Sequence, residues 1–140
     1  MKFYRFLACA ALFSLLILPT RAQNTQQPSQ EQQERQLMDY IDREVQRLTS
    51  LLDLEPWQEF YVDSVLNHDL HAMYEEVNGM SQARVGNADL YMNVQDRWMQ
   101  NIDDAYHRFF TEDQWKKYWK TGGKRAQAAR DKRARKRNSQ

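Results

Sequence analysis

Apolar side chains recur along this chain at steps of three and four residues, and this spacing constrains the fold more than any other feature. One run begins at about Glu34, a second follows Pro56, a third follows Asn87, and a short fourth follows Thr111. Residues three and four apart share one face of a helix, whereas strands alternate with a period of two. No run alternates in that way. The sequence predicts an all-α fold of three to four helices in a thin hairpin arrangement, curved or straight.

The residues between these runs predict where the helices begin and end. Pro56 suits the first position of the second helix, because the N–H that proline lacks would have no partner there. This helix is expected to end near Asn78, since Gly79 and residues 81–86 are typical of a turn. The fourth helix is expected to end at the glycine pair 122–123, because glycine accepts the left-handed conformation that often terminates helices.

Residues 1–22 have the parts of a cleavable signal peptide. Two cations precede an apolar run over residues 6–18, and Ala22 offers a small residue at a cleavage site. The run is shorter than the roughly 20 residues that span a bilayer, so a retained membrane anchor is the less favoured alternative. We expect export to the periplasm with cleavage near Ala22. Cleavage would remove Cys9, the one cysteine of the chain, and would leave no thiol for a disulfide.

The remaining chain divides by composition and charge. We predict a Gln-rich spacer at 23–33, a helical domain at 34–121 and a basic tail at 122–140, either disordered or helical. Residues 23–123 carry 18 acidic and 9 basic side chains, a net charge of −9, whereas residues 124–140 carry 8 basic and 1 acidic, a net charge of +7. In an exported protein such a tail is either a solvated terminus or a contact for an anionic envelope surface or an acidic protein surface, including the acidic part of this chain. We expect no binding to nucleic acid.

Two short motifs mark helix starts. Thr111 and Gln114 have the spacing of a capping box, in which each side chain bonds the backbone N–H of the other residue. A related start lies at the second helix, where a proline follows the capping position and a glutamine comes two residues later. The motif positions are Leu54, Pro56, Gln58, Phe110, Thr111 and Gln114.

This pair of helix starts resembles the Leu-Thr-x-x-Gln motifs of the Spy/CpxP family of periplasmic proteins. The second motif has Phe110 in place of leucine, and the first has Glu55 in place of threonine. The resemblance covers roughly residues 34–120. It implies an all-helical, curved homodimer that binds unfolded proteins without ATP and has no catalytic residues. It also implies that the motif residues shape helix junctions and do not contact clients, with the geometry at Glu55 left open.

Aromatic and methionine side chains on the helical faces are the candidate contacts for such clients. A thin layer of helices cannot bury all of them, and these side chain types adapt to varied partners. Core packing is still the favoured interpretation for any single one of them. The candidates are Trp57, Tyr61, Met73, Met80, Tyr91 and Trp98.

Metal binding and catalysis find little support in the sequence. His68 and His71 lie three residues apart, with Glu75 four residues further on, and such a set could hold a divalent metal. Two histidines are few for a structural site, so we expect no metal and no cofactor. The chain has no Gly-rich phosphate loop and no local catalytic motif, so we expect that it is not an enzyme.

The expected function is that of an ATP-independent periplasmic chaperone or envelope-stress adaptor that binds unfolded or envelope proteins. One alternative is a helical interaction module that docks to an envelope component through the basic tail. A weaker alternative is an envelope sensor that binds metal through His68 and His71.

Overall fold

The computed structural model describes residues 29–139, and almost all of them are helical. The helices are α1 (Gln30–Leu52), α2 (Pro56–Gln82), α3 (Ala88–Phe109), α4 (Glu112–Tyr118) and α5 (Lys124–Asn138), with the kinked segment η1 (Trp119–Gly123) between α4 and α5. The described residues contain no β-strand, so the predicted all-α fold is confirmed. The predicted signal peptide at 1–22 and the spacer before Ser29 lie outside the described residues.

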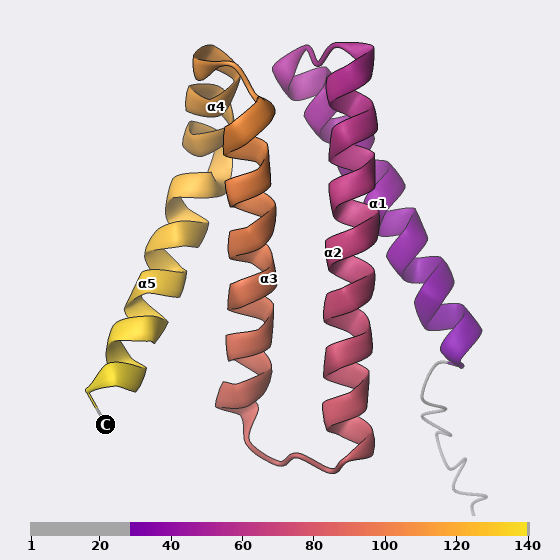
Figure 1. Ribbon diagram of the computed structural model, residues 1–140, viewed down its shortest axis with the longest axis vertical. Coiled ribbons are helices and arrows are strands. Elements are labelled where there is room, and N and C mark those ends of the chain that lie inside the picture. Colours follow the sequence, from indigo (N-terminus) through magenta and orange to yellow (C-terminus); the bar gives the residue numbers. More distant parts are fainter. Residues whose placement is uncertain (1–28, 140) are drawn as a thin grey trace, which may run out of the picture.

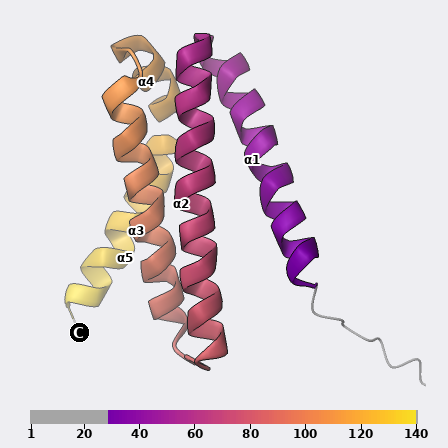
Figure 2. The ribbon, with the colours of Figure 1, turned by 45° about the vertical axis from the view of Figure 1, so that its right-hand side comes forward.

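A long antiparallel hairpin of α2 and α3 forms the centre of the molecule (Figure 1). Helix α1 contacts α2 near the junction between them and diverges from it toward its own N-terminus, a divergence that is also visible from a second side (Figure 2). Helix α5 runs back along α3 and diverges from it in the same direction. Within residues 29–139, no helix combines the length and the apolar character that a bilayer span requires.

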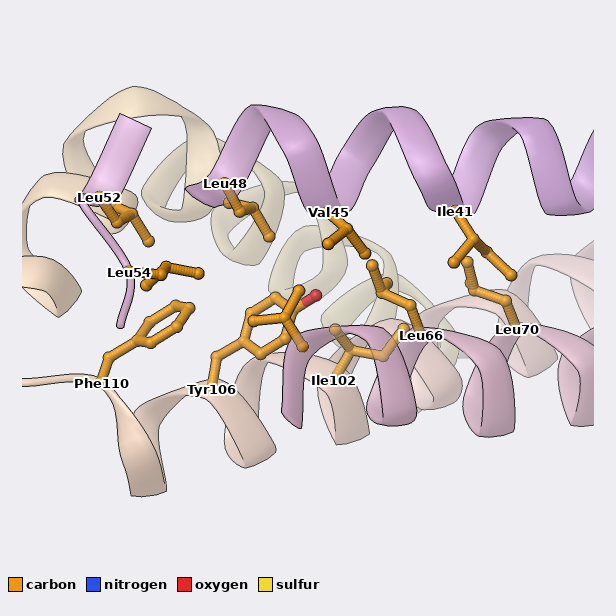
Figure 3. Packing of buried hydrophobic residues seen from close by; sticks show 11 residues of the cluster. Ile41, Val45, Leu48, Leu52, Leu54, Leu66, Leu70, Ile102, Tyr106 and Phe110 are labelled. Atoms are coloured by element: carbon orange, nitrogen blue, oxygen red, sulfur yellow. The ribbon is translucent and has the colours of Figure 1, made fainter. Parts of the chain in front are cut away.

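The hydrophobic core occupies one end of the hairpin. Side chains of α1 point toward those of α2 there, and Tyr106 and Phe110 close the layer from the third helix and its end (Figure 3). The core consists of Ile41, Val45, Leu48, Leu52, Leu54, Val62, Leu66, Leu70, Ile102, Tyr106 and Phe110. Burying each large apolar side chain contributes about 1.5–3 kcal/mol, so this end carries most of the hydrophobic stabilisation.

Helices α1 and α2 are longer than the sequence predicts. Helix α1 begins at Gln30 and so takes up the last residues of the predicted spacer, because Ser29 and Gln32 form a capping box: Gln32 Oε1 accepts from the Ser29 backbone at 2.9 Å. Helix α2 continues past Asn78 to Gln82. Gly79 is an exposed residue inside this helix, and one glycine within a helix costs only about 1 kcal/mol.

The glycine pair 122–123 forms a kink that separates the fourth helix from α5. Gly122 has a φ of 154°, a conformation that favours glycine, and the chain continues through η1 into α5. Gly123 is buried, and a Cβ at this position would lie 3.1 Å from the Trp119 ring. The prediction that glycine ends the fourth helix here is therefore confirmed: Gly122 leaves the helical conformation, and a separate helix, α5, follows.

Candidate protein-binding site

Two glutamines join the α1–α2 junction to the α3–α4 junction. The side-chain nitrogen of Gln58 donates to Gln114 Oε1 at 2.7 Å, and that of Gln114 donates to Gln58 Oε1 at 2.9 Å. Each nitrogen also donates to the last carbonyl of the helix that precedes the other junction, Phe109 at 3.1 Å and Leu52 at 3.4 Å. This set of bonds, the glutamine pair, holds together segments that are far apart in the sequence.

The same glutamines cap the helices that follow each junction. Gln58 Oε1 accepts from the Glu55 backbone N–H at 3.1 Å, and Gln114 Oε1 accepts from that of Thr111 at 2.9 Å. The Thr111 hydroxyl completes its box by accepting from the Gln114 backbone at 3.2 Å. The bond from the Glu55 backbone therefore forms although Glu55 replaces threonine. Pro56 is the first residue of α2, and the apolar motif residues Leu54 and Phe110 lie in the core.

Three aromatic rings are exposed on the first two turns of α2. Trp57, Phe60 and Tyr61 are 50%, 65% and 51% exposed, and together they form the aromatic cluster. Tyr61 makes edge contacts with Trp57 and Phe60, at centroid distances of 6.1 and 5.9 Å, and its ring also lies 5.8 Å from that of Phe109 on α3. A cluster of exposed, mutually supported rings is typical of a protein-binding surface.

The other four candidate contacts take part in packing within the molecule. Met73 packs against the core. The Trp98 indole donates to Glu76 at 2.9 Å, and the Tyr91 hydroxyl donates to a carbonyl of the α2–α3 loop at 2.9 Å. Met80 is half-buried near the end of α2. Of the six predicted residues, only Trp57 and Tyr61 therefore lie together on an open surface.

Phe60 is the most exposed ring of the cluster, and it is not among the six predicted contacts. The helical spacing predicts this exposure. Two residues of a helix are about 200° apart around its axis, so Phe60 lies on the face of α2 opposite Val62, which is fully buried. Met38 and Tyr40 on α1 are also exposed, at 50% and 46%, and neither is among the six predicted contacts.

A groove of about 540 Å³ lies between α1 and α2 beside the aromatic cluster. Val45, Pro56 and Phe60 supply its apolar lining. Three carboxylates also line it, one from α1 and two from α2: Asp42, Glu59 and Asp63. The groove therefore combines an apolar surface with negative charge.

The basic tail forms α5, which lies along α3 and is held there by ion pairs. Arg130 pairs with Asp103, and Arg133 donates to both carboxylate oxygens of Asp96, at 2.9 and 2.6 Å. The Tyr118 hydroxyl also donates to Asp103. Burial, with Asp103 as a second cause, raises the pKa of Tyr118, so the hydroxyl stays a donor at neutral pH. Arg130 is the one buried residue of α5, so ion pairs take the place of an apolar contact.

Acid is expected to loosen this contact. The hydrogen bond from Arg133 lowers the pKa of Asp96 below its ordinary value of 3.8, and Arg137 adds to the effect. A carboxylate whose pKa is lower in the folded state stabilises that state above its unfolded pKa, and the contribution is lost as the pH falls through the folded pKa. We expect hydrogen exchange of the α5 amides, corrected for the intrinsic effect of pH, to rise as the pH falls below 3.8.

The matched variant for this experiment is Asp96→Asn, which removes the titrating group and keeps the shape of the side chain. Its α5 amides should exchange faster at neutral pH and respond less to acid. An acid response equal to that of the unmodified protein would show that other carboxylates govern the contact.

The histidines do not form a metal site in this structure. His68 Nδ1 lies 2.7 Å from an oxygen of its neighbour Asp69, and His71 Nδ1 donates to the Asn67 carbonyl at 2.7 Å. No group of three or more His, Cys, Asp or Glu side chains within residues 29–139 is arranged to hold a metal ion. The described residues therefore provide no set of metal ligands that would support the sensor alternative.

Comparison with known proteins does not identify a family. The chain matches no family model, and no curated protein or solved structure shows significant similarity to it. The resemblance to the Spy/CpxP family therefore remains a prediction that rests on the two motifs.

Proposed function

We propose that this protein is an ATP-independent periplasmic chaperone or envelope-stress adaptor that binds non-native or partner proteins through the aromatic cluster. The observation that carries the proposal is the cluster itself. Trp57, Phe60 and Tyr61 stay at least half exposed, and Tyr61 contacts Phe109, which packs against the core. Exposed rings fixed in this way bind apolar segments of many sequences at a low cost in side-chain entropy.

Two features of the sequence support the cellular part of the proposal. The expected signal peptide would deliver the chain to a compartment where proteins must be bound without ATP. The motif resemblance implies the same class of activity, and the glutamine pair gives the motif residues a role at the helix junctions. The aromatic cluster is thereby left for partners.

An aggregation assay tests the proposal. The protein should suppress aggregation of several unrelated unfolding proteins at near-stoichiometric ratio. The triple variant Trp57→Gln, Phe60→Gln, Tyr61→Gln should need at least tenfold more protein for the same suppression, because a single hot-spot aromatic residue contributes about 2 kcal/mol or more and about 1.4 kcal/mol is already tenfold. All three rings are at least half exposed, so circular dichroism should show a folded variant.

The matched control also tests the docking alternative. Five cations of α5 are exposed and make no ion pair within the described residues, and the control replaces four of them: Arg125, Lys132, Arg135 and Lys136. Replacing all four with glutamine should leave suppression unchanged if the aromatic cluster binds clients. No suppression by the unmodified protein across several clients would refute the proposed function, and binding to anionic vesicles that requires these four cations would then favour the docking module.

A further inference from the structure

The negative charge of the protein is concentrated on α1 and α2. Residues 29–82 carry 12 acidic and 3 basic side chains, a net charge of −9, whereas residues 83–123 carry 6 of each. Helix α2 contains no Lys or Arg at all. The positive charge lies on α5, which runs along α3, while α1 lies beside α2 on the other side of the hairpin (Figure 1). The α1–α2 surface therefore attracts cations without competition from the tail.

The groove between α1 and α2 lies within this negative surface and beside exposed aromatic rings. No Lys or Arg lines the groove. Neither Asp42 nor Glu59 forms an ion pair within the described part of the chain, while Asp63 accepts only a hydrogen bond from Asn67. The nearby cation Arg47 is already paired with Glu44 at 2.6 Å. The carboxylates of the groove are thus available to a partner.

We propose that the groove selects cationic apolar segments, in which Lys or Arg alternates with aromatic or aliphatic residues. This inference rests on the proposed function and names the class of client that the site prefers. Apolar side chains of the segment would pack on Val45, Pro56 and Phe60, and its cations would pair with the carboxylates. The exposed rings of the aromatic cluster add cation–π contacts. Glu59 and Asp63 are four residues apart and share one face of α2, so adjacent cations of one segment can reach both.

Binding of two short peptides tests the inference. The peptides share the same leucine and phenylalanine residues and differ only in carrying Lys or Glu at the other positions. Fluorescence anisotropy with the purified protein should show tighter binding of the Lys peptide, with the preference decreasing in about 0.5 M salt because the groove is open to solvent. The variant Asp42→Asn, Glu59→Gln, Asp63→Asn should weaken binding of the Lys peptide roughly tenfold, about a factor of two for each exposed pair.

A second triple variant separates the groove from the overall charge. This variant, Glu34→Gln, Asp39→Asn, Glu75→Gln, removes the same charge from α1 and α2 at exposed positions outside the groove. It should weaken binding of the Lys peptide less than threefold. Equal effects of the two variants would overturn the inference. So would equal binding of the two peptides, although the proposed function would survive if both required the aromatic cluster. Self-association through α5 that blocks the Lys peptide would assign the groove to a second copy of the chain and would also overturn the inference.

Discussion

Replacing Gln58 with alanine is expected to lower the free energy of unfolding by about 3 kcal/mol, because a buried polar group without its partner costs about 1–3 kcal/mol. Gln58 is 2% exposed, and its amide bonds four groups: the Gln114 nitrogen and oxygen, the Phe109 carbonyl and the Glu55 backbone N–H. Alanine leaves all four without this partner and also opens a space beside the core. Urea denaturation monitored by circular dichroism measures this loss in the free energy of unfolding.

Gln95→Ala is the matched control, because Gln95 is exposed on α3 and its replacement should change stability by no more than about 0.5 kcal/mol. The double variant Gln58→Ala, Gln114→Ala gives a second test. Since the two amides bond each other, the double loss should be clearly smaller than the sum of the single losses. If the losses add, or if Gln58→Ala resembles Gln95→Ala, the glutamine pair does not join the two junctions.

The parts of the fold that depend on local chemistry could be predicted from the sequence. Asn87 caps α3, Thr111 caps α4 and Pro56 starts α2, and each of these signals acts within a few residues of itself. Helix ends were less predictable. Gly79 resembles a turn residue, but α2 continues through it to Gln82, since a single glycine weakens a helix without ending it.

The contacts that define the site depend on distances along the chain that local patterns do not encode. Gln58 and Gln114 are 56 residues apart, so their pairing follows from how the four helices meet. The two candidate tryptophans also differ because of contacts between distant segments. The Trp98 indole donates a hydrogen bond to Glu76 across the hairpin, whereas Trp57 is exposed. The sequence marked both as candidates, and only the position of α3 distinguishes them.

The second large effect is expected at the ion pair under α5. Replacing Arg130 with methionine leaves Asp103, which is 5% exposed, without its cation, and breaking a buried pair in this way costs about 3–5 kcal/mol. The molecule can avoid that cost by releasing α5, because this helix has no other buried residue, and release lets water reach Asp103. We therefore expect the α5 amides to exchange about a hundredfold faster, which corresponds to about 3 kcal/mol.

The location of the change distinguishes this mechanism from general destabilisation. Amides of α1, α2 and α3 that surround the core should keep their protection, since no core residue comes from α5. Arg125→Met is the control, because Arg125 is exposed on the same helix and makes no ion pair within residues 29–139; its α5 exchange should change less than threefold. If core and α5 amides lose protection together in Arg130→Met, α5 belongs to the same cooperative unit as the hairpin. If neither changes, the ions of the pair contribute little, and the contact of α5 depends on Arg133 and Asp96.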